Sequence, residues 1–208
     1  MLIFPGGDDP LSLSRLVLLL LVLGILLPQG TAQAAPFVPG PEEYWIKVDK
    51  SRLRLYLIQG KDTLVKSYPV AVGRGVGDVK KDRLDLITPE GVFKVRRVLQ
   101  DASQLVYDPA WFDEPGEPQK GVYGSKLISF YNPWQIAIHG TNSPRSVGRR
   151  ATHGCIRMKN RDINTLVAYV KPGMKIWIVG KDGKAPPGGK TAPPETPNLE
   201  PGVERDTL

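Results

Sequence analysis

The residues best suited to covalent chemistry lie close together in one short stretch of the chain. The single cysteine among the 208 residues, Cys155, follows both of the histidines, His139 and His153. A cysteine attacks as its thiolate, and a free thiol is mostly protonated at neutral pH. A neighbouring histidine can remove that proton or pair with the thiolate as an imidazolium. The cluster therefore predicts nucleophilic catalysis by Cys155.

The surrounding residues supply other features that a cysteine nucleophile needs. Gly154 permits a close approach of the backbone to a substrate, and the guanidinium of Arg157 could hold a substrate carboxylate. His153 shares a face with Cys155 if the segment is extended, whereas His139 ends an expected strand and could be brought opposite the cysteine by the fold. Sequence spacing alone leaves both histidines open as the base.

Zinc binding is the main alternative for this cluster. Structural zinc sites usually have four ligands drawn from Cys and His, and the chain has no second cysteine. We therefore expect no metal, and the chemistry needs no organic cofactor.

Strands must position most of these residues, because apolar and polar residues alternate along much of the chain. The alternation predicts an antiparallel meander from 44 to 72. Further strands are expected at 92–98, 127–131, 135–138 and 175–179. One helix is expected at about 161–170, with Asn160 as its N-cap. The pattern indicates a mostly β fold, either a β-sandwich or a partly open barrel, with one short α-helix.

A long irregular stretch, 100–124, interrupts the strand pattern. It contains Trp111, Phe112 and Tyr123, and such long loops in compact domains are usually functional or disordered. The aromatic residues favour an ordered loop, which we expect to lie beside the active site.

The two ends of the chain differ in composition from this core. The N-terminus has the pattern of a secretory signal peptide cleaved after Ala34: Arg15, then twelve apolar residues at 16–27, then small residues up to Ala34. The apolar run is shorter than the roughly 20 residues that span a bilayer, so no stable membrane span is expected. The expected organisation is a signal peptide at 1–34, a linker at 35–43, a domain at 44–180 and a disordered Pro/Gly-rich tail at 181–208.

The charge agrees with export to a bacterial surface. The formal net charge of the full chain is +7. Removal of residues 1–34, which contain one Arg and two Asp, raises it to +8. A basic exported protein associates with anionic surfaces such as a bacterial envelope. No nucleic-acid motif is present, so we expect no nucleic-acid partner and a location in the periplasm or cell wall.

Several motifs together resemble the catalytic signature of the L,D-transpeptidase family (the YkuD-type catalytic domain). The signature stretches here are His139-Gly140-Thr141 and Thr152-His153-Gly154-Cys155-Ile156-Arg157, and Asn160, Asp162 and Leu166 match the family's continuation. Upstream, Ser67-Tyr68-Pro69-Val70-Ala71-Val72-Gly73 and Thr88-Pro89-Glu90-Gly91-Val92-Phe93 resemble two further family elements. The likeness covers 44–179.

The resemblance implies a role for each signature residue. Cys155 would be the acylated nucleophile and His139 its base, oriented by the carbonyl of Gly140. His153 and Gly154 would support the site, and backbone N–H groups around 153–155 would form the oxyanion hole. The implied substrate-binding residues are Arg157, Thr141, Asn142 and Thr152.

The resemblance also implies the partners. These are peptidoglycan stem peptides as donor and acceptor, with carbapenem-type β-lactams as inhibitors. The same site acting with water would be an L,D-carboxypeptidase, and with another acceptor it would attach a protein to peptidoglycan. A catalytically silent wall-binding module is a further alternative. A papain-like wall hydrolase fits poorly, because its Cys usually precedes its His and no His follows Cys155.

Overall fold

The computed structural model describes residues 38–180 of the chain. The expected signal peptide and the expected tail lie outside these residues. No helix within 38–180 is long and apolar enough to cross a membrane.

The described part of the chain starts with the expected antiparallel meander. Its strands are β1 (Tyr44–Asp49), β2 (Arg54–Gln59) and β3 (Thr63–Pro69). Ile46 and Val48 of β1 and Leu55 and Leu57 of β2 are fully buried at alternate positions, and β1 also buries Trp45 and Asp49. The sequence alternation therefore marks the face of the meander that packs on the core.

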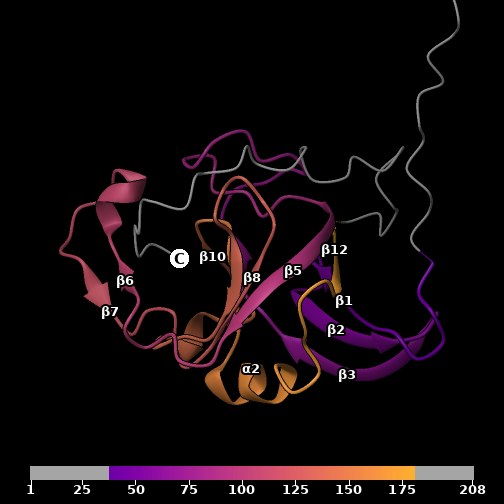
Figure 1. Ribbon diagram of the computed structural model, residues 1–208. Helices are drawn as coiled ribbons and strands as arrows, with labels where there is room; N and C mark the ends of the chain where they lie inside the picture. The colour runs from indigo at the N-terminus through magenta and orange to yellow at the C-terminus, as the bar shows by residue number, and fades with distance from the viewer. Residues whose placement is uncertain (1–37, 181–208) are drawn as a thin grey trace, which may run out of the picture. The chain divides into compact units, whose positions relative to one another are not determined.

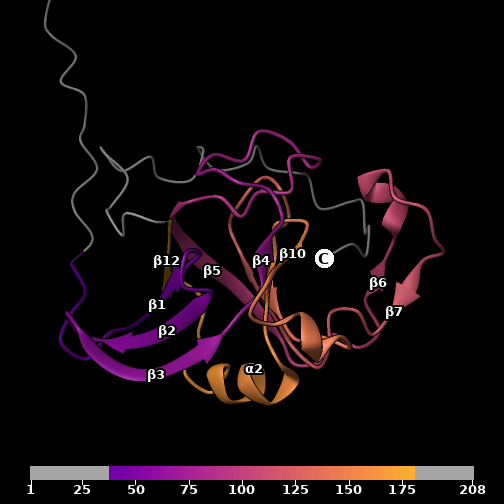
Figure 2. The same ribbon diagram turned by 180° about the vertical axis from the view of Figure 1, so that it is seen from behind.

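Eight strands form one mixed sheet. The remaining five are β5 (Gly91–Leu99), β8 (Leu127–Phe130), β9 (Ala137–His139), β11 (Ile156–Arg157) and β12 (Lys175–Val179). The order is β11-β9-β8-β5-β12-β1-β2-β3. β12 runs parallel to β1, and β11 runs parallel to β9; the other neighbours are antiparallel. The sheet is strongly bent in both views (Figures 1 and 2).

The two ends of this sheet are linked by hydrogen bonds. Ala71, just after β3, exchanges two backbone hydrogen bonds with Arg157 of β11, at 2.8 and 2.9 Å. A two-stranded parallel pair, β4 (Val72–Gly73) with β10 (Arg150–Thr152), continues from this junction. The result is a mostly β fold that closes partly on itself, as the sequence predicts.

One helix closes an end of the core. Helix α2 (Asn160–Leu166) lies below the sheet in both views (Figures 1 and 2) and buries Ile163 and Leu166. It is shorter than the predicted 161–170, because the chain changes to i→i+3 turns after Leu166. The prediction of Asn160 as the N-cap is wrong: Lys159 holds that position, and Asn160 is the first helical residue.

The stretch 100–124 is an ordered arm. It contains the short strands β6 (Val106–Tyr107) and β7 (Gln119–Lys120), which pair with each other, and the 3-10 helix η1 (Pro109–Phe112). Figure 1 shows these elements at one side of the sheet. A second 3-10 helix, η2 (Pro144–Ser146), lies in the segment between β9 and β10.

Candidate active site

The pairing of β9 with β11 brings the predicted residues together. Ile156 pairs with Ile138 and Arg157 with His139. Cys155 directly precedes β11, and its thiol forms a hydrogen bond with the backbone of Ala137. Because side chains alternate along strands, this register places Cys155 and Arg157 on the sheet face that also carries His139.

His139 is buried and held in one tautomer. Its Nδ1 lies 2.6 Å from the carbonyl oxygen of Gly140. A carbonyl oxygen only accepts, so the proton shared with Gly140 is on Nδ1 and the lone pair of the neutral ring is on Nε2. The imidazole also has a hydrogen bond with the backbone of Tyr123. The ring of Tyr123 lies edge-on to the imidazole, with 5.1 Å between the centroids. Burial, together with the charge of Arg157, lowers the pKa of His139 to about 3, so the imidazole is a neutral base at neutral pH.

Cys155 is only partly exposed, and its thiol is protonated at rest. Burial raises the pKa of the Cys155 thiol, while the Ala137 backbone hydrogen bond and the charges of Arg157 and Lys80 act in the opposite direction. A protonated thiol becomes nucleophilic when a base takes its proton during attack. A neutral thiol beside a neutral imidazole therefore fits general-base activation better than a resting ion pair.

Two threonines hold the turn that leads into Cys155. The Thr152 hydroxyl donates to the Cys155 carbonyl at 2.6 Å and accepts from the Gly154 N–H at 3.1 Å. The Thr88 hydroxyl donates to the Gly154 carbonyl at 2.7 Å and accepts from the Gly73 N–H at 2.8 Å. The Gly154 N–H is therefore occupied, so the N–H groups of His153 and Cys155 are the candidates for the oxyanion hole.

Gly154 is required in this turn for two reasons. Its φ of +131° lies in a region that side-chain-bearing residues rarely adopt. A Cβ at this position would also lie 2.8 Å from the carbonyl oxygen of Ile87. The glycine thus lets the turn before Cys155 pack directly against the backbone before Thr88.

His153 is packed against the 100–124 arm and Arg74. Its Nε2 lies 2.9 Å from Glu114 Oε1 and 2.8 Å from Arg74 Nη2, and Arg74 also contacts Glu114. Its ring stacks on Phe112, with centroids 4.0 Å apart, and on Tyr107 at 5.9 Å. These contacts fit the supporting role that the resemblance implies, and they place the 100–124 arm against the turn before Cys155.

Arg157 keeps an unneutralised charge beside the thiol. Its Nη1 donates to the Ser146 hydroxyl at 3.0 Å, and its buried Nε has no hydrogen-bond partner. Within the described part of the chain it forms no ion pair. Burial lowers the pKa of Arg157. A substrate carboxylate could satisfy both the charge and the free N–H.

The other predicted substrate-binding residues differ in exposure. Thr141 is buried, and its hydroxyl accepts from the Ser143 N–H at 3.0 Å. Thr152 is buried as described above, whereas Asn142 is exposed. Substrate contact by these three residues stays a prediction. No group of three or more His, Cys, Asp or Glu side chains among residues 38–180 is arranged to hold a metal ion.

Asn160 has a role that the sequence reasoning missed. Its Oδ1 accepts hydrogen bonds from the Thr141 N–H at 2.9 Å and the Ser125 N–H at 3.2 Å. It thereby fixes the backbone next to Gly140, whose carbonyl orients His139. Because Asn160 lies just before the expected helix, its position suggested an N-cap. Only its match to the family's continuation associated it with the site.

Comparisons with known proteins identify the family of the chain. The model of the L,D-transpeptidase catalytic domain (YkuD) matches residues 43–178. The candidate L,D-transpeptidase YkuD of Bacillus licheniformis is 31% identical over 157 residues, which cover 72% of this chain and 77% of the relative. YcfS of Escherichia coli, also assigned as an L,D-transpeptidase, is 28% identical over 152 residues, which cover 68% of this chain.

The chain spans only 46% of the length of YcfS. The solved structure of L,D-transpeptidase 3 from Mycobacterium tuberculosis with a faropenem-derived adduct has a TM-score of 0.49 and 14% identity, covering 65% of this chain and 60% of that one. The family model covers well over half of the chain and includes all of the site residues described above. The chain therefore belongs to the L,D-transpeptidase (YkuD) catalytic-domain family.

Proposed function

We propose that this protein is a cysteine acyltransferase that cross-links the stem peptides of bacterial peptidoglycan. The observation that carries the proposal is the β9–β11 register, which sets Cys155 on the same face as His139, with His139 Nδ1 fixed by Gly140. With the proton on Nδ1, the lone pair of the neutral imidazole is on Nε2, which would accept the thiol proton.

The first half of the reaction acylates the enzyme. The Cys155 sulfur attacks the carbonyl carbon of the third residue of a tetrapeptide stem, and His139 takes the thiol proton. The tetrahedral oxyanion is stabilised by the N–H groups of His153 and Cys155. When the intermediate collapses, the C–N bond breaks and the terminal D-Ala leaves with the proton from His139. The product is a thioester on Cys155.

The second half transfers the acyl group. The side-chain amine of the third residue of another stem attacks the thioester carbon, and His139 takes a proton from this amine. The C–S bond breaks and the Cys155 thiolate regains a proton. The product is a third-to-third cross-link. Water in place of the amine would give an L,D-carboxypeptidase, and another acceptor would attach a protein to peptidoglycan.

Mass spectrometry of the products formed from a disaccharide-tetrapeptide tests this proposal. A cross-linked dimer that has lost one D-Ala is expected from the wild type and not from Cys155→Ala. A tripeptide monomer alone would identify a carboxypeptidase. Cys155→Ala should keep the wild-type circular dichroism spectrum, and an unchanged product pattern in this variant would contradict the nucleophile assignment.

Carbapenem-type β-lactams provide a second test of the nucleophile. We propose that Cys155 opens the β-lactam ring and keeps the acyl group as a thioester. The intact mass of the wild type should then increase by the mass of the carbapenem, and that of Cys155→Ala should not. An unchanged wild-type mass would count against a reactive thiol.

We further propose that the protein acts outside the cytoplasm, in the periplasm or cell wall. Support comes from the apolar run and small residues within 1–34 and from the formal charge of +8 without that segment. Expression of the full chain in a bacterium, followed by N-terminal sequencing of the envelope fraction, should show cleavage after Ala34. Uncleaved protein confined to the cytoplasm would contradict this proposal.

A further inference from the structure

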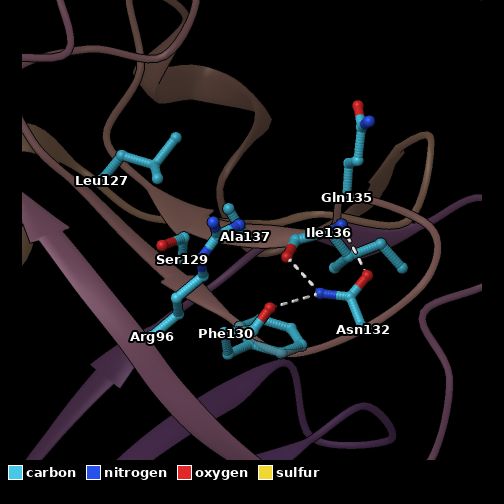
Figure 3. Close-up of a pocket in the computed structure, with 8 residues that line it drawn as sticks. All are labelled: Arg96, Leu127, Ser129, Phe130, Asn132, Gln135, Ile136 and Ala137. Carbon is cyan, nitrogen blue, oxygen red and sulfur yellow. Dashed lines mark hydrogen bonds between the residues drawn. The ribbon is translucent and has the colours of Figure 1, made fainter. Parts of the chain in front are cut away.

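A small cleft lies between residues of β5, β8 and β9 and the loop that joins β8 to β9. Its volume is about 60 Å³, and the residues that bear on its chemistry are Arg96, Ser129, Gln135 and Ala137 (Figure 3). Such a volume holds a group of only a few heavy atoms, comparable to about two water molecules. Ala137 belongs both to the cleft and to the site, because its backbone forms the hydrogen bond with the Cys155 thiol.

The sheet register places the cleft on the same face as the base. Ser129 pairs with Ala137, and Leu127 pairs with His139. Residues two apart on a strand share a face, so Ser129 and Ala137 lie beside the Leu127–His139 pair on one face of β8 and β9. Leu127, Ala137 and His139 are buried on this face, so a peptide would approach the cleft from its exposed side, where Arg96 lies.

A β-bulge directs Arg96 into the cleft. Val95 pairs with Phe130 and Arg97 pairs with Ser129, so Arg96 is the extra residue of β5 at this position. Bulges redirect side chains and occur often next to active sites. In Figure 3 the guanidinium of Arg96 lies toward Ser129 and Ala137. Arg96 forms no ion pair with any acidic residue of the described chain, 38–180.

The side chain of Asn132 links the rim of the cleft through four hydrogen bonds. Asn132 accepts from the N–H groups of Trp134 and Ile136 and donates to the carbonyls of Phe130 and Ile136, at 2.8–3.1 Å. This network holds Gln135 at a φ of +57°, a backbone conformation that costs energy for a non-glycine residue. The Ser129 hydroxyl donates to the Arg97 carbonyl at 3.2 Å, so Arg96 is the charged donor that the cleft offers to a ligand.

We propose that Arg96 and this cleft bind a carboxylate of the peptide substrate, separate from any carboxylate held by Arg157. The proposal rests on the proposed function, because it adds a specificity-determining contact to the same site. The carboxylate belongs either to the donor stem, which acylates Cys155, or to the acceptor stem, which resolves the thioester. Arg96 acts by binding and takes no part in proton transfer.

Arg96→Gln tests the proposal, with Arg97→Gln as a matched control. Both arginines are exposed neighbours on β5 and their substitution removes the same charge, but only Arg96 lines the cleft. The release of D-Ala gives KM for the donor, and the ratio of cross-linked to hydrolysed product against acceptor concentration gives the apparent affinity for the acceptor. Arg96→Gln should either raise KM for the donor or lower the apparent affinity for the acceptor by about tenfold or more, as expected for the loss of a charge-assisted hydrogen bond. Arg97→Gln should leave both unchanged.

Peptides amidated at one carboxylate at a time identify the group that is bound. Amidation of the recognised carboxylate should reproduce the loss in the wild type and add nothing further in Arg96→Gln, as expected for a coupled pair. An effect on the donor alone or on the acceptor alone identifies the source. Equal values for Arg96→Gln, Arg97→Gln and the wild type would overturn the proposal.

Peptide binding to Cys155→Ala separates this inference from the proposed function. Calorimetry with an intact tetrapeptide requires no turnover, so it still reports on the cleft if the wild type forms no cross-link. The Arg96→Gln change should raise Kd about tenfold in that background, and the Arg97→Gln change should not. Equal Kd values with and without the Arg96→Gln change would exclude binding of a donor carboxylate in the cleft. If the acceptor dependence of cross-linking were unchanged as well, the cleft would have no role in substrate binding.

Discussion

The hydroxyl of Thr88 donates a hydrogen bond to the carbonyl oxygen of Gly154 at 2.7 Å, although 66 residues separate the two in sequence. The same hydroxyl accepts from the N–H of Gly73. Three separate signature stretches of the sequence therefore meet at one buried side chain. The peptide unit that precedes Cys155 is held from outside its own loop.

Replacing Thr88 with valine should disrupt this junction without changing its volume much. The Gly154 carbonyl and the Gly73 N–H would lose a buried partner, at a cost of about 1–3 kcal/mol in the free energy of unfolding. Acylation by a carbapenem should slow as well, because the turn is no longer fixed. Thr88→Ser keeps the hydroxyl and should retain most of both properties. Equal stability of the valine and serine variants, measured by urea unfolding, would show that the bond contributes little.

The two histidines should differ in their effect on acylation. His139→Ala removes the proposed base and should reduce the initial acylation rate by about 10²–10⁴-fold. His153→Ala removes a ring that is packed between the arm and the catalytic turn, so a smaller loss is expected. Stopped-flow acylation by a carbapenem provides the measurement. The opposite order of effects would assign the base to His153.

Removing the side chain of Asn160 should loosen the backbone beside His139. Asn160→Ala leaves the N–H groups of Thr141 and Ser125 without their acceptor, which should cost about 1–3 kcal/mol of stability. The acylation rate should fall together with it, since Gly140 orients the base. Asn164→Ala is the control, because Asn164 lies on the same helix, is exposed and accepts a hydrogen bond from the Ser125 hydroxyl. Equal effects of the two changes would argue against a positioning role.

His139 should make the fold sensitive to mild acid. Its pKa is about 3 in the folded protein against an ordinary value of 6.5, so the unfolded chain binds more protons between these pH values. The stabilising contribution is fully present above pH 6.5 and is lost as the pH falls toward 3. Its slope is at most about 1.4 kcal/mol per pH unit.

Urea unfolding of the wild type and of His139→Gln, from pH 7 down to about pH 4, isolates this contribution. The glutamine variant should lose less stability over the interval, because it lacks the group that the unfolded chain protonates. Parallel curves for the two proteins would show that His139 is already solvated in the folded state.

Local sequence patterns predicted the strands and the helix in which apolar residues recur with a regular period. They failed for short strands whose partners are far away in the sequence. The β1–β3 meander follows directly from the alternation around Ile46 and Leu55. The predicted helix extended to 170 because Val167 and Val170 keep the apolar stripe, and both still pack on the core from the turns after Leu166. Strand β10 was missed because its partner is the two-residue β4, about 78 positions away by the Arg150–Val72 pairing.

The candidate site was partly visible in the same way. Residue type and spacing marked Cys155 and its neighbours, but the assignment of His139 to a strand beside β11 depends on a parallel pairing with no local signal. The partners of His153 are also distant in sequence: Arg74 precedes it by 79 positions and Glu114 by 39. No spacing rule relates such residues, so their convergence emerges only from the folded chain.

The parallel pairing of β1 with β12 has a mechanical consequence. The chain enters this pair at Tyr44 and leaves it at Val179, at opposite ends of two neighbouring strands. Tension applied through the flanking segments would act along the strands and be shared by all of the hydrogen bonds between them. Terminal strands in an antiparallel pair would instead lose their hydrogen bonds in succession. The domain is therefore built to resist stretching between its two ends.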